Sequence, residues 1–255
     1  MTQNTQTLDG KISLVTGAGA GIGRAIALHY AKNGATVVVS DINEESGQET
    51  VNLITEFGGT ASFKKSDVSK ADDATALVQF AVDKYGRLDI ACNNAGIAPP
   101  ATPLAEVDDA LWRKINSVNL DGVFYGIRAQ INAMLRNNGE GGTIVNIVSI
   151  LGQVGFTGLG PYVATKHAVV GLTKQVAVDY AAQKIRAIAV GPAFIKTGME
   201  DNLDPDSRAA LDDMHPIGRM GEVDEVGAVV AAVSAPGWSF VNGAYLPVDG
   251  GFLSR

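Results

Sequence analysis

The chain is 255 residues long, and glycine is its compositional outlier, with 30 residues, or about 12%, against an average near 7%. Apolar residues make up 46% and charged residues 18%, which excludes a disordered or supercharged chain and favours a large core. The net charge of −7 argues against a general binder of nucleic-acid phosphates. At roughly 150 residues per domain, the length predicts one large domain where no linker is found.

The first residues, MTQNTQT, have neither the basic nor the apolar region of a secretory signal, and no apolar run approaches the ~18 residues that a membrane span needs. We therefore expect a soluble, cytoplasmic protein. The single cysteine, Cys92, excludes an intramolecular disulfide and is most simply a small core residue. The histidines do not group with Cys92 at metal-ligand spacing, so no metal site is predicted.

Short apolar runs rich in β-branched residues alternate with longer helical patterns along the whole chain. The expected strands cover residues 12–16, 36–40, 61–65, 88–92, 143–148, 185–190 and 245–248. The expected helices cover about residues 21–33, 44–57, 71–85, 108–136, 160–182 and 222–234, with a further short helical pattern near 199–213. This alternation predicts an α/β fold with parallel strands in one sheet and helices on both faces. Since no linker or repeat divides the chain, one domain is expected.

The first predicted strand runs directly into a glycine-rich turn at residues 16–24 and then into a helical pattern. Gly17, Gly21 and Gly23 have the spacing G-x-x-x-G-x-G, and Gly19 lies between them. Glycine permits positive φ and lets backbone N–H groups approach a pyrophosphate at a helix N-terminus. The position between a strand and a helix favours dinucleotide binding over the alternative, a bare structural loop.

Aspartates follow the second and third predicted strands. Asp41 lies 18 residues after Gly23, where its carboxylate can accept hydrogen bonds from the adenosine ribose and would repel a 2′-phosphate. This predicts NAD rather than NADP; the alternative is an ordinary residue at a strand end, and the cation Arg24 lies just beyond the turn. Asp67 either accepts from the adenine amino group or caps the helical pattern that begins near Lys70, and the sequence alone leaves both roles open.

Tyr-x-x-x-Lys occurs twice, as Tyr162/Lys166 and as Tyr180/Lys184, so the pattern by itself decides nothing. Tyr162 follows the fifth predicted strand by a short glycine-rich loop and lies near the beginning of its helix, beside the carboxyl ends of the strands. Tyr180 lies 18 residues later, about 27 Å along the same helix. Only the first pair is therefore placed to act on a substrate.

Tyr162 and Lys166 share one helical face, and a cation beside a phenol can lower its pKa from near 10, so that it serves as a general acid/base. The alternative is a pair of surface residues on an amphipathic helix. Ser149 lies 13 residues before Tyr162 and can hold a substrate oxygen beside the phenol. Asn119, inside the predicted helix 108–136, suits an amide that anchors a water linked to Lys166.

The least regular region covers residues 191–221 and carries Pro192, Pro205 and Pro216 around a short helical pattern. It follows a strand at the carboxyl edge of the sheet, where α/β proteins bind ligands. Its apolar side chains predict a hydrophobic or cyclic substrate and a substrate-binding lid over it. These side chains are Phe194, Met199, Leu203, Met214 and Met220.

In combination and in order, these features resemble the short-chain dehydrogenase/reductase family over essentially the whole chain. The resemblance is carried by residues 16–23, Asp41, Asp67, Val68, residues 93–96, Asn119, Ser149, Tyr162, Lys166, Pro192, Thr197 and residues 249–251. It implies a Rossmann-like, doubly wound, seven-stranded sheet in the order 3-2-1-4-5-6-7, hydride transfer between nicotinamide C4 and a carbinol carbon, and a homotetramer. The chain departs from the family's Asn before a Pro-Gly pair, because Ile188 and Gly191-Pro192-Ala193 stand there.

The resemblance also implies which residues bind NAD. Asn93 is expected beside the adenosine ribose, Lys166 also at the nicotinamide ribose, and Pro192, Ile195 and Thr197 at the nicotinamide. The expected cofactor-binding residues are Gly17, Gly19, Gly21, Ile22, Gly23, Asp41, Asp67, Val68, Asn93, Ala95, Gly96, Tyr162, Lys166, Pro192, Ile195 and Thr197. The expected catalytic residues are Asn119, Ser149, Tyr162 and Lys166.

The leading hypothesis is an NAD-dependent secondary-alcohol dehydrogenase or ketone reductase. An alternative is a 3-oxoacyl-thioester reductase, a group of the family that commonly uses NADPH and an acidic carrier, which Asp41 and the net charge disfavour. From another class, a non-catalytic nicotinamide-sensing protein has no need of all the catalytic residues. A homo-oligomer is expected because the helix from Tyr162 is small and apolar over much of its circumference. The residues concerned are Ala164, Ala168, Val169, Val170, Leu172, Val176 and Ala177.

Overall fold

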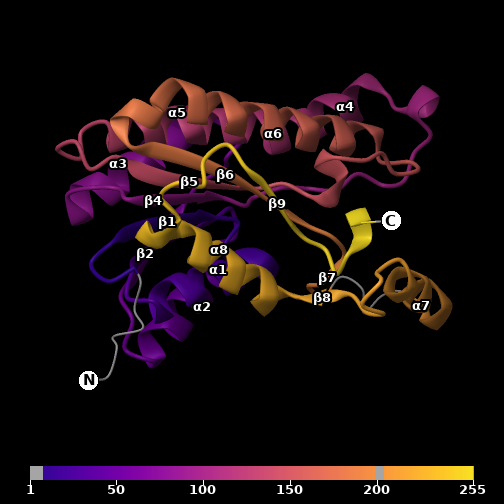
Figure 1. The fold of residues 1–255 in the computed structure, drawn as a ribbon, viewed down its shortest axis with the longest axis horizontal. Helices are drawn as coiled ribbons and strands as arrows, with labels where there is room; N and C mark the ends of the chain where they lie inside the picture. Colours follow the sequence, from indigo (N-terminus) through magenta and orange to yellow (C-terminus); the bar gives the residue numbers. More distant parts are fainter. Residues whose placement is uncertain (1–7, 199–203, 255) are drawn as a thin grey trace.

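A computed structural model describes residues 8–198 and 204–254, and in it parallel strands form one seven-stranded sheet (Figure 1). The strand order is β3-β2-β1-β4-β5-β6-β9. The strands are β1 (Ile12–Thr16), β2 (Thr36–Asp41), β3 (Ala61–Lys65), β4 (Ile90–Asn93), β5 (Gly142–Ile147), β6 (Ile185–Pro192) and β9 (Tyr245–Val248). The expected doubly wound α/β fold and its strand order are confirmed, with β9 as the seventh strand.

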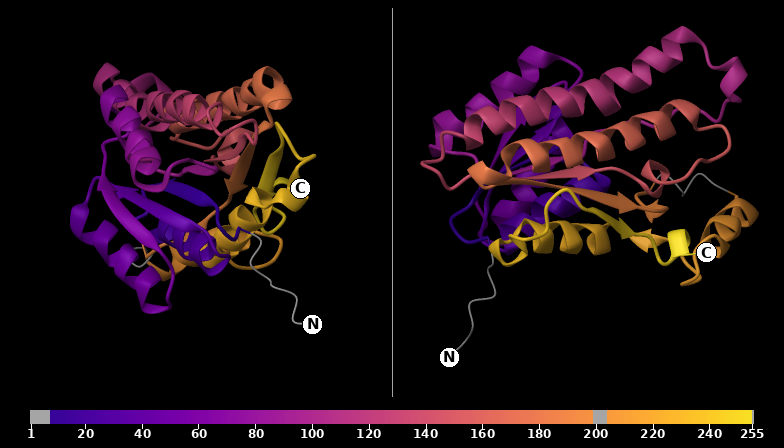
Figure 2. Two further views of the ribbon diagram at one scale, coloured as in Figure 1. Left: turned by 90° about the vertical axis from the view of Figure 1, so that its left-hand side faces the viewer. Right: turned by 45° about the horizontal axis from the view of Figure 1, so that its top comes forward.

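Helices cover both faces of this sheet, as the views in Figures 1 and 2 show. One layer contains α3 (Ala71–Tyr85), α4 (Asp109–Asn116), α5 (Gly122–Met134) and α6 (Gly160–Tyr180). The other contains α1 (Gly21–Lys32), α2 (Glu44–Glu56) and α8 (Val223–Ser234). Because all seven strands of this sheet are parallel, their carboxyl ends meet at a single edge, and open α/β sheets bind ligands at this edge.

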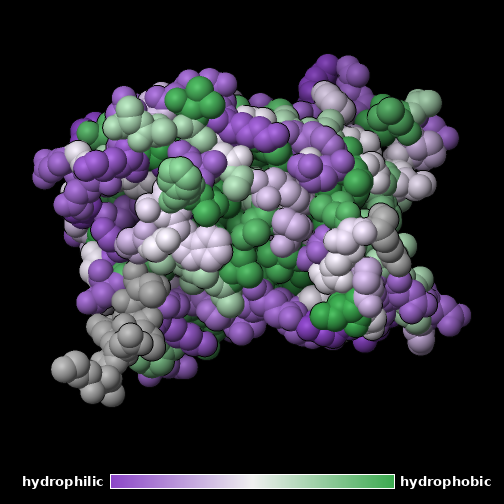
Figure 3. Space-filling model, viewed as in Figure 1, coloured by the Kyte–Doolittle hydropathy of each residue, from purple (hydrophilic) through white to green (hydrophobic). Residues whose placement is uncertain are grey.

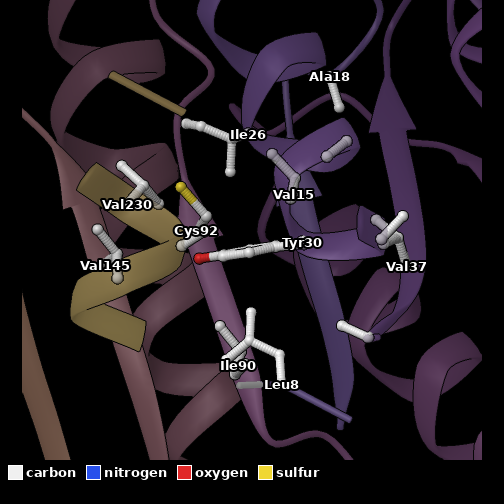
Figure 4. Close-up of a cluster of buried hydrophobic side chains, with 14 of the residues drawn as sticks. Leu8, Val15, Ala18, Ile26, Tyr30, Val37, Ile90, Cys92, Val145 and Val230 are labelled. Atoms are coloured by element: carbon white, nitrogen blue, oxygen red, sulfur yellow. The ribbon is translucent and has the colours of Figure 1, made fainter. Parts of the chain in front are cut away.

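Alternate residues of each strand belong to separate cores, because successive side chains point to opposite faces. Val15 packs with α1 and α8, whereas Leu14 packs with α3 and α5. Figure 4 shows the first core, in which the ring of Tyr30 lies among aliphatic side chains and Cys92. Cys92 is fully buried and free, as the sequence predicts. Burial on both faces explains why these strands are near-continuous apolar runs.

The predicted helix 108–136 is interrupted. A π-helical turn, η2 (Ser117–Asp121), separates α4 from α5. Such turns are rare and frequently lie at functional sites. Shorter 3-10 turns occur at η1 (Leu104–Glu106), η3 (Ile150–Gly152), η4 (Ala181–Gln183), η6 (Pro236–Trp238) and η7 (Phe252–Ser254).

The region after β6 contains a small parallel ribbon that the sequence did not predict. In it β7 (Ile195–Lys196) pairs with β8 (Gly221–Glu222), and α7 (Pro205–Asp213) lies between them in the chain. Ion pairs reinforce the ribbon: Lys196 to Glu222 at 2.8 Å, and Arg219 to Glu225 at 2.8 Å. Of the residues expected here, Met199 and Leu203 lie outside the described part of the chain, as do residues 1–7.

Within the described residues, none of the helices has the length and apolar character needed to span a bilayer. On the face shown in Figure 3, a group of apolar side chains lies near the centre, around the β9 edge of the sheet.

Candidate active site

A cleft of about 490 Å³ opens at the carboxyl edge of the sheet. The glycine turn after β1 and the segments after β2, β3 and β4 form its walls, and Thr197 closes one side. Its volume lies in the usual range for small-molecule sites. Of the residues expected to bind a cofactor, it brings together Gly17, Gly21, Ile22, Gly23, Asp41, Asp67, Val68, Ala95, Gly96 and Thr197. Sequence reasoning missed Ala20, Ser40, Ile42, Ser66, Asn94, Ile97 and Val118.

The glycine turn has the geometry of a phosphate cradle. Gly17 and Gly21 have φ of 62° and 52°, which side chains rarely adopt. A Cβ on Gly23 would overlap the carbonyl of Gly17, so no larger residue fits there. The N-cap residue of α1, Ala20, has no side-chain capping hydrogen bond, which leaves the first N–H groups of the helix available to an anion. These features fit a dinucleotide pyrophosphate.

Asp41 lies across this turn at the end of β2. Its carboxylate oxygens accept hydrogen bonds from the backbone N–H groups of Gly19 and Asn43, each at 2.9 Å. The nearby cation, Arg24, is bound instead to the Gly19 carbonyl and to the carboxylate of Glu49. Because Arg24 is already paired, the carboxylate of Asp41 sets the charge at this end of the cleft. A carboxylate in this position can accept hydrogen bonds from a ribose diol.

Asp67 lines the cleft, and the helix-capping role considered for it is wrong. The N-cap residue of α3 is Lys70 rather than Asp67. The carboxylate of Asp67 accepts hydrogen bonds from Ser69, from Oγ at 2.7 Å and from the backbone N–H at 3.1 Å. The bond from the Ser69 hydroxyl lowers the pKa of Asp67. Asp67 is therefore a fixed, ionised acceptor on the cleft wall.

The side chain of Asn93 does not lie beside the ribose position, which corrects the expectation for it. Asn93 is buried at the end of β4 and donates to Asn146 at 2.8 Å, and it exchanges hydrogen bonds with Gln130. Its neighbour Asn94 faces the cleft instead and donates to the Thr16 carbonyl at 2.9 Å. The expected bracing of the central strands by residues 93–96 is thus present, with Asn94 bonded to β1.

Ser149 and Tyr162 meet just beyond the end of β5. Ser149 Oγ accepts from the Leu151 N–H at 3.1 Å, which orients the hydroxyl at the start of η3. Tyr162 stands in the first turn of α6, and its phenol is hydrogen-bonded to Ser149. Burial raises the pKa of Tyr162 to about 12, and the bond to Ser149 opposes this rise.

Lys166 lies one turn further along α6, with its Nζ 5.3 Å from the centroid of the Tyr162 ring. Nζ donates to the carbonyl of Ile147 at 2.9 Å, and the side chain is buried. Burial lowers the pKa of Lys166 to about 8. Burial therefore opposes the expected lowering of the phenol pKa by Lys166, because it disfavours the charged forms of both side chains.

Asn119 lies in the π-helical turn and is completely buried. Its amide pairs with the backbone of Ile97: Oδ1 accepts from the N–H and Nδ2 donates to the carbonyl, each at 2.8 Å. The amide thus holds the backbone at Ile97, and its expected role of anchoring a water stays a prediction. A Cβ on Gly96 would lie 3.4 Å from Asn119 Oδ1 and 3.8 Å from Lys166 Nζ, so the bare Gly96 separates the two side chains.

The remaining expected residues lie around these groups. Pro192 ends β6 and is buried. Ile195 packs against the α1 and α8 core and lines a separate small pocket with Phe194, so it does not face the nucleotide cleft. Thr197 does face it, because a Cβ on Gly21 would lie 3.6 Å from the Thr197 side chain.

The second Tyr-x-x-x-Lys pair is excluded from the site. Tyr180 is the last residue of α6, and Lys184 follows η4 in a left-handed conformation. Lys184 lines a pocket at the opposite edge of the sheet, with Lys11 and Glu140. The prediction that only Tyr162 and Lys166 stand at the carboxyl edge is confirmed.

The comparisons with known proteins agree with this arrangement. The family model described as enoyl-(acyl carrier protein) reductase matches residues 17–253. A solved structure, a short-chain type dehydrogenase/reductase from Mycobacterium marinum, superposes with a TM-score of 0.93 at 31% identity and covers 99% of each chain. This chain is a short-chain dehydrogenase/reductase.

Among curated relatives of this short-chain dehydrogenase/reductase is the cyclohexanol dehydrogenase of Acinetobacter sp. strain SE19. The two are 42% identical over 245 residues, which covers 96% of each chain. The cis-4-hydroxycyclohexanecarboxylate dehydrogenase of Sinomonas cyclohexanicum is 38% identical over 244 residues, covering 96% of this chain and 97% of that protein.

Proposed function

We propose that this short-chain dehydrogenase/reductase is an NAD-dependent oxidoreductase that interconverts cyclic secondary alcohols and ketones. The observation that carries the proposal is the convergence of Ser149, Tyr162 and Lys166 beside a cleft with a phosphate cradle. The relatives named as dehydrogenases of cyclohexanol and of a hydroxycyclohexane carboxylate support the substrate class.

The residues of the cleft fit the cofactor. The cradle at Gly17, Gly21 and Gly23 suits the pyrophosphate, and Asp41 suits the adenosine ribose. When bound, NAD supplies the acceptor for the hydride from the carbinol carbon. The nicotinamide end would then lie toward Thr197 and Lys166, as the resemblance implies.

In alcohol oxidation the protein's own residues handle the proton. The Ser149 hydroxyl holds the substrate oxygen next to the phenol, and ionised Tyr162 accepts the proton as the carbon–hydrogen bond breaks. The charged form of Lys166 stabilises the phenolate across the face of its ring. In ketone reduction the same groups act in reverse, and Tyr162 returns its proton to the oxygen. We assign Asn119 a supporting role, since it fixes the backbone beside Lys166.

The rate of alcohol oxidation is expected to rise steadily toward alkaline pH. Tyr162 has to lose its proton before it can accept one, and burial holds its pKa high, at about 12 in the protein alone. Initial rates between about pH 6 and pH 8, where Lys166 keeps its charge, should therefore climb in the oxidative direction, whereas ketone reduction, which needs the protonated phenol, should not. A flat oxidative profile would count against Tyr162 as the base.

Replacing Asp41 by asparagine is expected to weaken the preference for NAD. The kcat/KM with NAD should fall about tenfold to a hundredfold, because a charge-assisted acceptor for the ribose is lost, and the kcat/KM with NADP should rise once the repulsion is removed. Paired initial-rate measurements with the two cofactors test this. Asp83→Asn, an exposed change on α3, is the matched control, and an unchanged cofactor ratio in Asp41→Asn would refute the assignment.

Phe156 and Phe194 provide an apolar surface suited to a ring. They pack edge to face at 5.7 Å, and Phe194 in turn contacts His215 at 5.9 Å. Phe156 belongs to the loop that leads into α6, and Phe194 follows β6, so both lie next to segments that carry site residues. We propose that residues 191–198 and 204–221 form the substrate-binding region. A panel of cyclic and open-chain secondary alcohols tests this, with faster turnover of the cyclic members expected.

A second candidate is reduction of a 3-oxoacyl thioester. The family model that matches residues 17–253 is described as an enoyl-(acyl carrier protein) reductase, which favours a thioester as the second candidate substrate. Acetoacetyl thioesters assayed with NADH and with NADPH distinguish the candidates, because the thioester function predicts the higher rate with NADPH. Turnover of any alcohol would also exclude the non-catalytic nicotinamide sensor.

We propose that the protein is a homotetramer, although some of the α6 residues expected at the subunit interface do not lie on the surface. Val169, Val170 and Val176 of α6 are buried in the protomer's own core, so they cannot form an interface. Large apolar side chains elsewhere in this helical layer are exposed, namely Trp112 of α4 and Phe124 of α5, each at 43%. Light scattering of the purified protein is expected to give four times the protomer mass, and a monomer would contradict the proposal.

A further inference from the structure

Tyr245 is the first residue of the edge strand β9 and lies opposite Ala189 of its neighbour β6. Its ring occupies the space at Gly191 of β6, where any Cβ would overlap the phenol. The φ of Gly191 is not in the positive region, so glycine stands there to leave room rather than to allow an unusual backbone. Gly191 belongs to the segment in which this chain departs from its family's Asn and Pro-Gly pattern.

The hydroxyl of Tyr245 reaches the catalytic serine. It donates a hydrogen bond to the backbone carbonyl of Ser149 at 3.1 Å. Burial, together with the charge of Asp249, raises the pKa of Tyr245 to about 12, so the phenol remains a donor throughout the working pH range. The bond therefore ties Ser149 to the edge strand of the sheet.

Ser149 needs such a tie because it lies beyond the regular strand pairing. The last paired residues of β5 and β6 are Ile147 and Val190. After them, Ser149 is held by local contacts, in which its carbonyl accepts from the Gly152 N–H at 2.8 Å and its Oγ accepts from the Leu151 N–H at 3.1 Å. The preceding residue, Val148, still donates to the Val190 carbonyl of β6 at 2.8 Å, so Ser149 is the first residue after β5 whose backbone bonds stay within the η3 turn. The Tyr245 hydroxyl adds a bond from β9, whose register with β6 is fixed.

We propose that Tyr245 is a positioning residue that holds the Ser149 hydroxyl against Tyr162, and that Gly191 provides the space for it. This proposal rests on the proposed function, in which Ser149 and Tyr162 act together. The hydrogen bond from Ser149 lowers the pKa of Tyr162, so a displaced Ser149 leaves the phenol harder to ionise. Loss of the Tyr245 hydroxyl should then slow proton transfer without removing any group that touches the substrate.

Tyr245→Phe tests the proposal, since it removes the hydroxyl and keeps the ring. We expect kcat for alcohol oxidation to fall about threefold to tenfold, the alkaline rise of the pH profile to move to higher pH, and the KM for NAD to stay within about twofold. Tyr85→Phe is the matched control, because the Tyr85 hydroxyl makes a comparable bond to Ser62 at 3.0 Å, far from the site. Unchanged kcat and pH profile in Tyr245→Phe would overturn the proposal.

A double-mutant cycle shows whether Tyr245 acts through Ser149. In a Ser149→Ala background the further change Tyr245→Phe should alter kcat by less than about twofold, because the hydroxyl being positioned is gone. A loss as large as in the wild-type background would overturn the proposal. Gly191→Ala should reproduce the Tyr245→Phe pH shift, since the added methyl displaces the phenol.

Hydrogen exchange tests the same contact without turnover. In Tyr245→Phe the amides of Leu151 and Gly152 should exchange faster than in the wild type, while those of β1 stay unchanged. Equal exchange at Leu151 and Gly152 would overturn the positioning role. A wild-type protein that oxidised none of the alcohols would contradict the proposed function, and the exchange measurement would still decide whether Tyr245 holds Ser149.

Discussion

Tyr162→Phe is expected to lower kcat for alcohol oxidation about a thousandfold or more while NAD still binds within about fivefold of wild-type affinity. The change removes the oxygen that exchanges a proton with the substrate and leaves the ring packed in place. The glycine cradle, Asp41 and Asp67 lie on other segments and are not disturbed. Steady-state rates, together with titration of NAD by calorimetry, measure both quantities on the same protein.

The other Tyr-x-x-x-Lys pair supplies the control for this experiment. Tyr180→Phe, at the far end of α6, should leave kcat within about twofold of wild type, because Tyr180 is remote from the carboxyl edge. Retained turnover in Tyr162→Phe would remove Tyr162 from the mechanism. Equal losses in the two variants would point to a general disturbance of the helix instead.

Lys166→Met is expected to abolish turnover to a similar degree and yet to stabilise the fold. A buried ammonium is costly, which is why burial lowers the pKa of Lys166 to about 8, against an ordinary value near 10.4. This difference corresponds to about 3 kcal/mol of lost stability at neutral pH. Losing the hydrogen bond to the Ile147 carbonyl costs about 1 kcal/mol, so the free energy of unfolding should rise by about 2 kcal/mol.

The stabilisation by Lys166→Met is expected to depend on pH. Between about pH 8 and pH 10.4 the unfolded chain binds more protons at Lys166 than the folded protein does, so the stability of the wild type rises with pH in this window. The advantage of the variant should therefore shrink and disappear near the upper end. Urea unfolding at several pH values measures it, with exposed Lys174→Met on the same helix as the control. A destabilised variant at neutral pH would contradict the burial argument.

Much of the fold follows from the sequence because the central strands are buried on both faces and read as apolar runs. The expected bounds 12–16, 61–65 and 245–248 match the strands Ile12–Thr16, Ala61–Lys65 and Tyr245–Val248, although the last two lie toward the edges of the sheet and are less buried. The π-helical turn at Ser117–Asp121 could not be predicted from the apolar pattern, because it adds only about one residue to a single turn of a long helix. Asn119, an asparagine inside a predicted helix, was the one residue in the sequence that pointed to an irregular site there.

The incorrect predictions for the site also have physical reasons. Asn93 and Asn94 are adjacent, and at a strand end one side chain faces the helices while the next faces the cleft, so a motif alone cannot assign them. Strands of two residues, such as β7 and β8, are too short to show an alternating pattern. The contact between Tyr245 and Ser149 joins residues 96 positions apart and requires the three-dimensional arrangement.

The proposed function is tested most directly by the initial rate of cofactor reduction by the purified protein with cyclohexanol-type alcohols, measured in parallel with NAD and NADP. We expect alcohol-dependent reduction of NAD, faster with cyclic than with open-chain secondary alcohols, and a kcat/KM at least about tenfold lower with NADP. No alcohol-dependent reduction of either cofactor, or a clear preference for NADP, would contradict it.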